Sequence, residues 1–216
     1  MRQHLIKGHA ILFDLDGVLV DSLSLIERIL REWAAEHRLD GDRAVALSHG
    51  RRDIDVVRMI APHLNAEAES RRIVEREEHD FDGLTATRGA TRLLSALPPD
   101  AWAIVTSGAR AVAQGRLVAA GLPQPKILVA GDDIQHGKPH PEGYLTAAAL
   151  LGATPARCIV VEDAPAGVRA AHAAGMQCIG IGGVLADVDA LLGARVDGLH
   201  CVNVKSDVEG LLITCS

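Results

Sequence analysis

The chain has 216 residues, and at roughly 150 residues per domain this length fits one core with a substantial insertion. Hydrophobic residues make up 48% of the chain and charged residues 23%, a composition that excludes a disordered or collagen-like protein. Lys and Arg number 22 against 28 Asp and Glu, so the net charge is -6. With two Trp, two Phe and one Tyr for stacking, we expect no nucleic acid partner.

The sequence pattern indicates neither a membrane-spanning helix nor a disulfide. No apolar run approaches the ~20 residues of a membrane-spanning helix, and residues 1–10 lack the apolar segment of a signal peptide. We therefore expect a cytoplasmic protein without a membrane partner, either a monomer or a homodimer. The four cysteines form no C-x-x-C pair and are expected to be reduced packing residues; they are Cys158, Cys178, Cys201 and Cys215.

Short runs of β-forming residues recur along the chain, at 10–15, 101–106, 126–130, 157–161, 177–181 and 198–202. They are apolar on both faces, which indicates strands of a parallel sheet covered by helices on both sides. Helical stretches at 110–120, 141–151 and 164–174 lie between the later runs, each followed by a glycine where a helix should end. The predicted fold is α/β, with a doubly wound, mostly parallel, Rossmann-like sheet.

A helical insertion interrupts this pattern after the first run. About 85 residues separate the first two runs, whereas a βαβ unit needs only ~30. An amphipathic helix begins near Leu25, with Ser24 and Glu27 as its predicted capping box, and helical stretches follow at 53–61 and 66–79. We therefore expect a helical cap at residues 18–83, inserted into a core made of residues 1–17 and 84–216.

Two acids stand at the end of the first predicted strand. Asp14 and Asp16 are two residues apart, so on a strand both point into one crevice at the carboxyl edge of the sheet, where α/β proteins bind ligands. An Asp-Gly turn would also explain Asp16 and Gly17. A carboxylate that ends an apolar strand, however, must be paired or bound to a metal when it is buried.

Further polar groups end the later strands. Thr106 and Ser107 can bind phosphate oxygens or merely cap a helix. Lys138, one of four lysines, lies in a proline-rich loop, which favours a placed charge over a solvated one. Glu162 and Asp163 end the strand at 157–161, as ligands or as helix-capping acids. Together these carboxylates suit a hard cation such as Mg²⁺. The cation, the lysine and the hydroxyl groups would then neutralise a bound phosphoryl group.

The segments FDLDGVLVDS, TSG, GKPHPEGY and VVEDAPAGV, in this order, resemble the four motifs of the haloacid dehalogenase superfamily. The insertion resembles the small helical cap of its phosphatase and β-phosphoglucomutase-like members. The resemblance implies a Mg²⁺-dependent phosphoric monoester hydrolase in which Asp14 is the nucleophile that forms an aspartyl phosphate. It also implies that Asp16 is the general acid and base.

The same resemblance implies the binding groups. Thr106 and the Ser107 amide would hold the phosphoryl group, and Lys138 would neutralise it. The metal would be bound by Asp163 together with Asp14 and the backbone carbonyl of Asp16, with Glu162 in a supporting role.

We expect the loop Ser48-His49-Gly50-Arg51-Arg52 to lie between the first two cap helices. It is similar to the cap loop of 2-deoxyglucose-6-phosphate and glycerol-3-phosphate phosphatases. His49 and Arg51 are therefore expected to bind substrate hydroxyls, the alternative being a solvated loop. The expected partner is a small phosphorylated metabolite, namely a sugar, a polyol or a related compound.

Two other functions use similar residues. A phosphomutase of the β-phosphoglucomutase type carries a histidine in the opening turns of the first cap helix, where this chain has Leu25 and Ile26. It also carries Lys-Asn after the serine of the second motif, where this chain has Gly108 and Ala109. A signalling receiver uses Asp, Mg²⁺, Thr or Ser and Lys, but it lacks an acid two residues after its aspartate and has no inserted cap.

Overall fold

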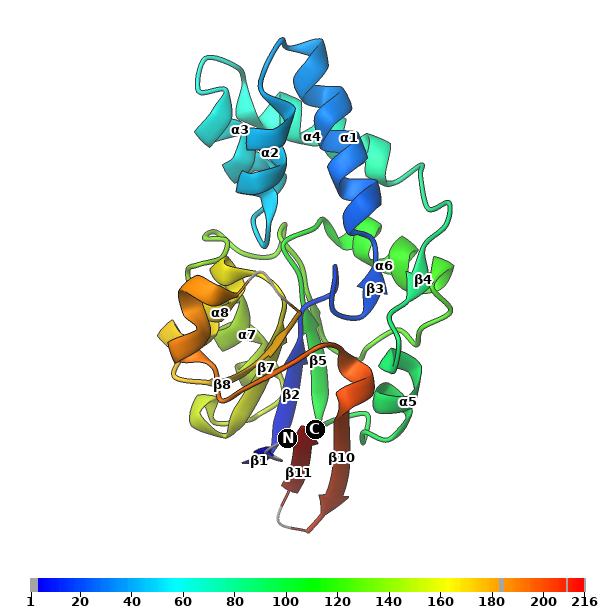
Figure 1. Cartoon of the computed structure of the whole chain (residues 1–216), viewed down its shortest axis with the longest axis vertical. Helices are drawn as coiled ribbons and strands as arrows, with labels where there is room; N and C mark the ends of the chain where they lie inside the picture. The colour runs from blue at the N-terminus through cyan, green and yellow to red at the C-terminus, as the bar shows by residue number, and fades with distance from the viewer. Residues whose placement is uncertain (1–3, 183–184, 209, 216) are drawn as a thin grey trace.

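The computed structural model describes residues 4–182, 185–208 and 210–215. Its core is a parallel sheet with the strand order β6-β5-β2-β7-β8-β9 (Figure 1). These strands are β2 (Ala10–Phe13), β5 (Trp102–Val105), β6 (Leu128–Val129), β7 (Cys158–Glu162), β8 (Gln177–Ile181) and β9 (Ala194–Val196). Every residue of β2 and β5 is buried, as expected for strands that are covered on both faces.

Helices cover the two faces of this sheet. On one face the side chains of α5 (Ala90–Ser95) and α6 (Arg110–Ala119) pack with Phe13 of β2. On the other face α7 (Glu142–Leu150) and α8 (Pro165–Ala173) pack with Leu12 of the same strand. Short 3-10 turns lie at Pro155–Arg157 and Ala186–Leu191. The predicted doubly wound α/β core is therefore confirmed.

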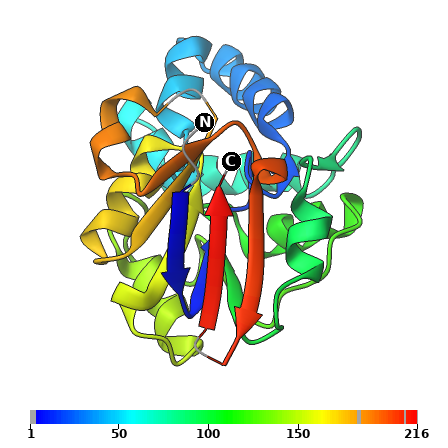
Figure 2. The same ribbon diagram turned by 60° about the horizontal axis from the view of Figure 1, so that its bottom comes forward.

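A second sheet was not predicted. It is antiparallel, with the order β1-β11-β10, and consists of β1 (His4–Gly8), β10 (Val202–Asp207) and β11 (Gly210–Cys215) (Figure 2). The strand predicted at 198–202 is wrong, because Leu199–Cys201 is a 3-10 turn and β10 starts only at Val202. In β11 buried residues alternate with partly exposed ones, so a search for runs apolar on both faces misses it.

Four helices gather at one end of the molecule, and we call them the cap helices (Figure 1). They are α1 (Leu23–Glu36), α2 (Gly41–Ser48), α3 (Asp53–Ile60) and α4 (Ala66–Glu77). The chain leaves the core and returns to it through a two-stranded ribbon, β3 (Val20–Asp21) with β4 (Thr85–Ala86). Trp33 and Ile73 of the cap helices are fully buried and belong to the same apolar cluster as Phe13 of β2.

Two details of the predicted cap are wrong. Helix α1 begins at Leu23, so Ser24 and Glu27 lie inside it and form no capping box. The N-cap residue is Ser22, but its hydroxyl donates to Asp16 Oδ1 and accepts no capping hydrogen bond from the helix amides. Helix α2 was also missed, so the loop at 48–52 connects the second and third cap helices rather than the first two.

The remaining expectations concern cysteines and membranes. All four cysteine thiols are free, in agreement with their predicted role as packing residues. None of the helices within the described residues is long and apolar enough to cross a membrane.

Candidate active site

The Lys138 ammonium lies between two buried carboxylates at the carboxyl edge of the parallel sheet. It contacts Asp14 Oδ1, lies 2.6 Å from Glu162 Oε1, and donates to the carbonyl oxygen of Val105 at 3.2 Å. Burial raises the pKa of Asp14 to about 7, although Lys138 opposes this shift. Burial alone would lower the pKa of Lys138, but the two carboxylates outweigh it and raise the pKa. Lys138 is therefore a fixed positive charge beside Asp14.

Glu162 holds this lysine in place. Its Oε1 also accepts a hydrogen bond from the Tyr144 hydroxyl at 2.8 Å, and its Oε2 accepts from the backbone amides of residues 163 and 164, both at 3.0 Å. A Cβ atom at Gly167, in the first turn of α8, would collide with the Glu162 carboxylate. Both carboxylate oxygens of Glu162 are thus engaged by protein groups, which makes it a support for Lys138.

A hard cation fits the carboxylates beside Lys138. Oxygen atoms of Asp14, Glu162 and Asp163 lie within 4.8 Å of one another. Burial, together with Glu162 and Asp14, raises the pKa of Asp163 well above its usual value. Glu162 and Asp14 add negative charge at Asp163 that Lys138 opposes, and oxygen donors of this kind suit Mg²⁺.

The backbone after Asp16 lies against this group of acids. Gly17 has φ +78°, and a Cβ atom there would collide with the carboxylate of Asp163. The Asp16 side chain does not join the group, because its Oδ1 accepts from Ser22 Oγ at 2.5 Å and from Arg116 at 2.8 Å.

Thr106 and Ser107 follow β5 and face the same pocket. Thr106 is buried, and its hydroxyl oxygen accepts from the Gly108 amide at 3.1 Å. The Ser107 hydroxyl donates to the carbonyl oxygen of Gly50 in the cap loop at 2.9 Å. Since that hydroxyl is engaged with the cap, the Ser107 amide is the group left for a ligand.

The cap loop closes the pocket from above. His49, Gly50 and Arg51 line it together with Asp14 and the other core residues named above. A Cβ atom at Gly50, where φ is +71°, would lie 2.9 Å from the Ala164 Cβ, so the loop sits directly on the core. Arg51 donates from one guanidinium nitrogen to the Leu47 carbonyl oxygen at 2.9 Å. The two predicted cap residues therefore reach the pocket that holds Asp14.

Arg52 faces away from this pocket and ties the cap to the core. Its guanidinium donates to the carbonyl oxygen of Ile134 at 3.1 Å, and its Nε lies 2.7 Å from Asp55 Oδ2. It is a cross-domain contact on the far side of the loop.

Three charged residues that the motifs did not indicate lie beside Asp16. Arg116 is buried and pairs with both Asp16 and Glu77, while Asp53 lines the same pocket. Burial, then the neighbouring Glu77, raises the pKa of Asp53 well above its usual value. The one sequence signal is that Arg116 shares the apolar face of α6 with Ala113 and Leu117, where a charge is unexpected.

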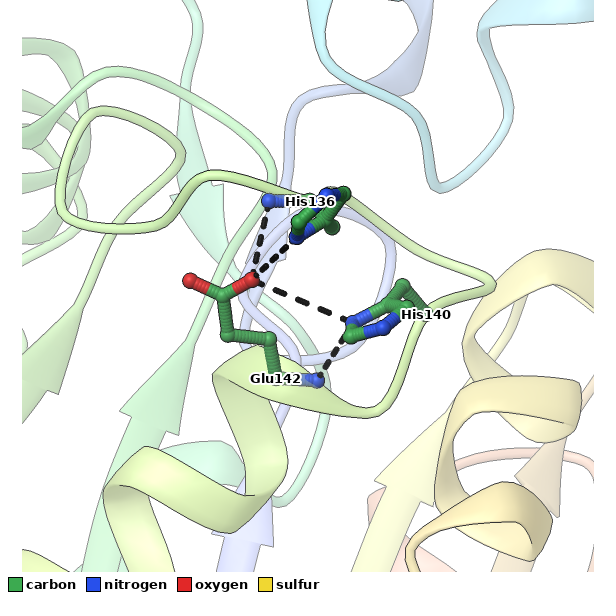
Figure 3. A group of neighbouring side chains, drawn as sticks. All are labelled: His136, His140 and Glu142. Atoms are coloured by element: carbon green, nitrogen blue, oxygen red, sulfur yellow. Dashed lines mark hydrogen bonds and ion pairs between the residues drawn. The ribbon is translucent and has the colours of Figure 1, made fainter.

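A second cluster lies on the loop that carries Lys138 and at the start of α7: His136, His140 and Glu142 (Figure 3). Oxygen atoms of Glu142 accept from the backbone amides of Gln135 at 2.8 Å and His136 at 3.0 Å, and these hydrogen bonds, with the His136 ring, lower its pKa to about 2. His140 Nδ1 accepts from the Glu142 amide at 3.3 Å. The cluster therefore clamps the lysine-bearing loop onto the start of α7.

Comparisons with known proteins agree with this geometry. The model of the haloacid dehalogenase-like hydrolase family matches residues 9–175. Hexitol phosphatase A of Escherichia coli K12 is 45% identical over 175 residues, which are 79% of this chain and 81% of that protein. Glycerol-1-phosphate phosphohydrolase 2 of Saccharomyces cerevisiae is 34% identical over 188 residues, or 82% and 75% of the two chains. A solved hydrolase from Pseudomonas syringae has a TM-score of 0.78 at 26% identity, covering 89% of this chain and 94% of its own.

The family match spans most of the chain, including all four motifs and the cap helices. It confirms the resemblance that the motifs indicated. The chain belongs to the haloacid dehalogenase-like hydrolase family and is one of its phosphoric monoester hydrolases.

Proposed function

We propose that the protein is a Mg²⁺-dependent phosphatase that hydrolyses a small phosphorylated sugar or polyol through an aspartyl phosphate. The observation that carries the proposal is the Lys138–Asp14 pair, because Asp14 lines a pocket whose other wall is the polar cap loop. We further propose residues 18–83 as the cap and residues 1–17 and 84–216 as the core. The ribbon of β3 with β4 supports this division, because the chain passes between the two parts there.

In the first half of the reaction an Asp14 carboxylate oxygen attacks phosphorus, and the bond between phosphorus and the ester oxygen breaks. Lys138 offsets the repulsion between the carboxylate and the dianionic phosphoryl group. Thr106 and the Ser107 amide hold the phosphoryl oxygens. Mg²⁺, held by Asp14, Asp163 and the backbone carbonyl of Asp16, would supply further positive charge to this group.

Asp16 transfers a proton in each half of the reaction. Its Oδ2 would lie 3.9 Å from a Cβ atom on Gly108, so it faces the phosphoryl side of the pocket, while Oδ1 is held by Ser22 and Arg116. As the ester bond breaks, Asp16 donates its proton to the leaving alkoxide. In the second half it takes a proton from the water that attacks the aspartyl phosphate, which regenerates Asp14 and releases phosphate.

The cap side of the pocket supports a neutral, hydroxyl-rich leaving group. It offers polar groups on Ser48, His49 and Arg51 together with the carboxylates of Glu27 and Asp53. Carboxylates accept hydrogen bonds from hydroxyl groups and repel a second anion. The names of the two relatives, a hexitol phosphatase and a glycerol-1-phosphate phosphohydrolase, agree with a polyol or sugar as the alcohol.

A phosphomutase is the weaker alternative. The wall that α1 contributes to the pocket consists of Leu23, Ile26 and Glu27, which offer no imidazole at the start of the first cap helix.

A panel of monophosphates of hexitols, hexoses, glycerol and small carboxylic acids, read by phosphate release with Mg²⁺, tests the proposal. We expect turnover of the neutral hydroxylated compounds, loss of turnover in EDTA and recovery when Mg²⁺ is added back. Full activity in metal-free buffer, or preference for an acid such as a phosphorylated hydroxy acid, would contradict it. Transfer of the phosphoryl group to another sugar hydroxyl in place of water would favour the mutase.

A further inference from the structure

Arg116 joins the cap to the general acid. It lies on the core helix α6 and is only 2% exposed. One of its terminal nitrogens lies 2.8 Å from Asp16 Oδ1, and the other lies 2.8 Å from Oε1 of Glu77, the last residue of cap helix α4. The two ends of a single planar guanidinium are thus held by two acids, one in the core and one in the cap.

The pair of hydrogen bonds at Asp16 Oδ1 fixes the orientation of this carboxylate. Ser22 Oγ and Arg116 both donate to Oδ1, at 2.5 Å and 2.8 Å. Among the described residues, no hydrogen bond to Oδ2 is found, and this oxygen faces the phosphoryl side near Gly108. The carboxylate is therefore held by one oxygen, which leaves the other for the leaving group.

The buried carboxylate of Glu77 depends on Arg116 as its ion-pair partner. It is 3% exposed, and burial raises its pKa although Arg116 opposes that shift. Asp53, on α3, adds a second cap carboxylate near the same guanidinium. A buried carboxylate without a partner is strongly unfavourable, so the cap can bring Glu77 to this position only when Arg116 is there to receive it.

The contact between α4 and α6 is fixed by local packing as well. Gly115 precedes Arg116, and a Cβ atom there would collide with the ring of Phe81, which follows the end of α4. The absent side chain at Gly115 lets the segment after Glu77 lie flat on α6.

From this geometry we propose that Arg116 is a positioning residue that couples cap closure to the orientation of Asp16. With the cap closed, Glu77 holds one end of the guanidinium, so that the other end holds Asp16 Oδ1 and Oδ2 faces the ester oxygen. When the cap opens, Glu77 withdraws and Asp16 loses this constraint. Proton donation is thus restricted to the state in which the leaving group is enclosed. The inference rests on the proposed function, because it takes Asp16 as the proton donor to the leaving group.

The test compares kcat/KM for two esters, p-nitrophenyl phosphate and phenyl phosphate. The nitrophenolate leaves without much protonation, whereas phenolate needs the proton, and kcat/KM reports the steps up to departure of the alcohol. We expect Arg116→Met and Glu77→Gln to lower kcat/KM for phenyl phosphate by at least ~10-fold more than for p-nitrophenyl phosphate, within the ~10²- to 10⁴-fold that acid catalysis supplies.

The matched control is Arg52→Met. Arg52 also bridges cap and core, through the Ile134 carbonyl, but it does not touch Asp16. Weaker closure alone should lower kcat/KM for both esters by the same factor. If Arg116→Met or Glu77→Gln also lowers both equally, the coupling is overturned.

A double variant separates positioning from folding. Arg116→Met leaves the buried Glu77 without its ion-pair partner, whereas Arg116→Met combined with Glu77→Met removes both members of the buried cap-to-core pair. We expect the double variant to recover thermal stability but not the phenyl phosphate activity. Recovery of both would show that the pair serves folding alone. A wild-type protein that cleaves both aryl esters but no sugar or polyol phosphate would overturn the proposed substrate and leave this inference intact.

Discussion

Glu162 Oε1 lies 2.6 Å from Lys138 Nζ, and this contact is completely buried beneath the pocket. The same carboxylate binds the Tyr144 hydroxyl and the amides at the start of the segment that leads into α8. Glu162 therefore fixes the lysine relative to the strand end that carries Asp163. Neighbouring acids at a strand end thus have separate tasks, one supporting the lysine and one belonging to the proposed metal site.

The first prediction concerns this support. Replacing Glu162 by Gln removes the negative charge beside Lys138. It also replaces one of the two acceptor oxygens by an NH2 group, which cannot accept the hydrogen bonds donated there. We therefore expect the free energy of unfolding to fall by about 3–5 kcal/mol. We also expect a lower kcat, because Lys138 is no longer fixed. Urea unfolding and steady-state kinetics measure the two effects. The control Tyr144→Phe removes one hydrogen bond and should lower stability by about 0.5–1.5 kcal/mol with little change in kcat. A fully stable and active Glu162→Gln variant would contradict the assignment.

The second prediction separates the two acids of the first motif. Asp14→Asn removes the nucleophile, so no phosphoenzyme should form, whereas Asp16→Asn keeps the nucleophile and loses proton transfer. Incorporation of phosphate from acetyl phosphate, whose leaving group needs little protonation, measures the difference. We expect labelling of the Asp16→Asn protein and none of the Asp14→Asn protein. Labelling of Asp14→Asn at the wild-type level would refute its role as nucleophile.

The parallel core was predictable because its strands are continuously apolar, so their ends mark where polar side chains must gather. One edge of the sheet brings together the polar residues of the segments that follow these strands, namely Asp14, Thr106, Lys138 and Asp163. The antiparallel sheet was not predictable in this way, because β11 buries alternate residues only. Helix α2 was missed since its eight residues bury just Ala44 and Val45.

The network around Asp16 could not be predicted from spacing. Arg116 lies 100 residues after Asp16 and 39 residues after Glu77 in the chain, and only packing of α4 on α6 joins them. Ser22 stands at the N-cap position of α1, where a serine hydroxyl normally accepts from a helix amide. Its hydroxyl instead supports the acid on which the chemistry depends.

The third prediction links pH, metal and stability. Burial raises the pKa of Asp14 to about 7 in the folded protein, from 3.8 for an exposed aspartate. The folded state therefore binds the proton more tightly than the unfolded state, so this contribution to stability is fully present below about pH 4 and is lost as the pH rises through about 7. In EDTA we expect the wild-type Tm to fall across this range more steeply than that of Asp14→Asn.

Addition of Mg²⁺ should reverse the trend, because a cation that binds the ionised carboxylates stabilises the folded state increasingly as the pH rises. Melting curves at pH 5 and pH 8, with EDTA or with Mg²⁺, make the comparison. Equal slopes for the wild type and Asp14→Asn in EDTA would show that Asp14 is not the group that titrates.

The fourth prediction is that the cap loop chooses the alcohol. Asp14, which Lys138 contacts, and Thr106 line the core side of the pocket, whereas His49 and Arg51 reach it from the cap. Changing His49 or Arg51 to Ala should raise KM and lower kcat/KM for the preferred polyol or sugar phosphate. Each lost hydrogen bond to a neutral hydroxyl corresponds to roughly 0.5–1.5 kcal/mol, or about 2- to 12-fold, and more if the group is charged.

Two comparisons decide whether the loop recognises substrate or only closes the pocket. Hydrolysis of p-nitrophenyl phosphate should fall much less in His49→Ala and Arg51→Ala, because its good leaving group needs few contacts with the cap. Gly50→Ala, which requires a side chain at φ +71° and crowds Ala164, should instead impair closure and lower both activities together. Arg58→Ala, an exposed arginine on the same cap, serves as the control and should change neither. Equal losses for the two esters in His49→Ala and Arg51→Ala, with an unchanged Tm, would assign the loop to closure rather than recognition.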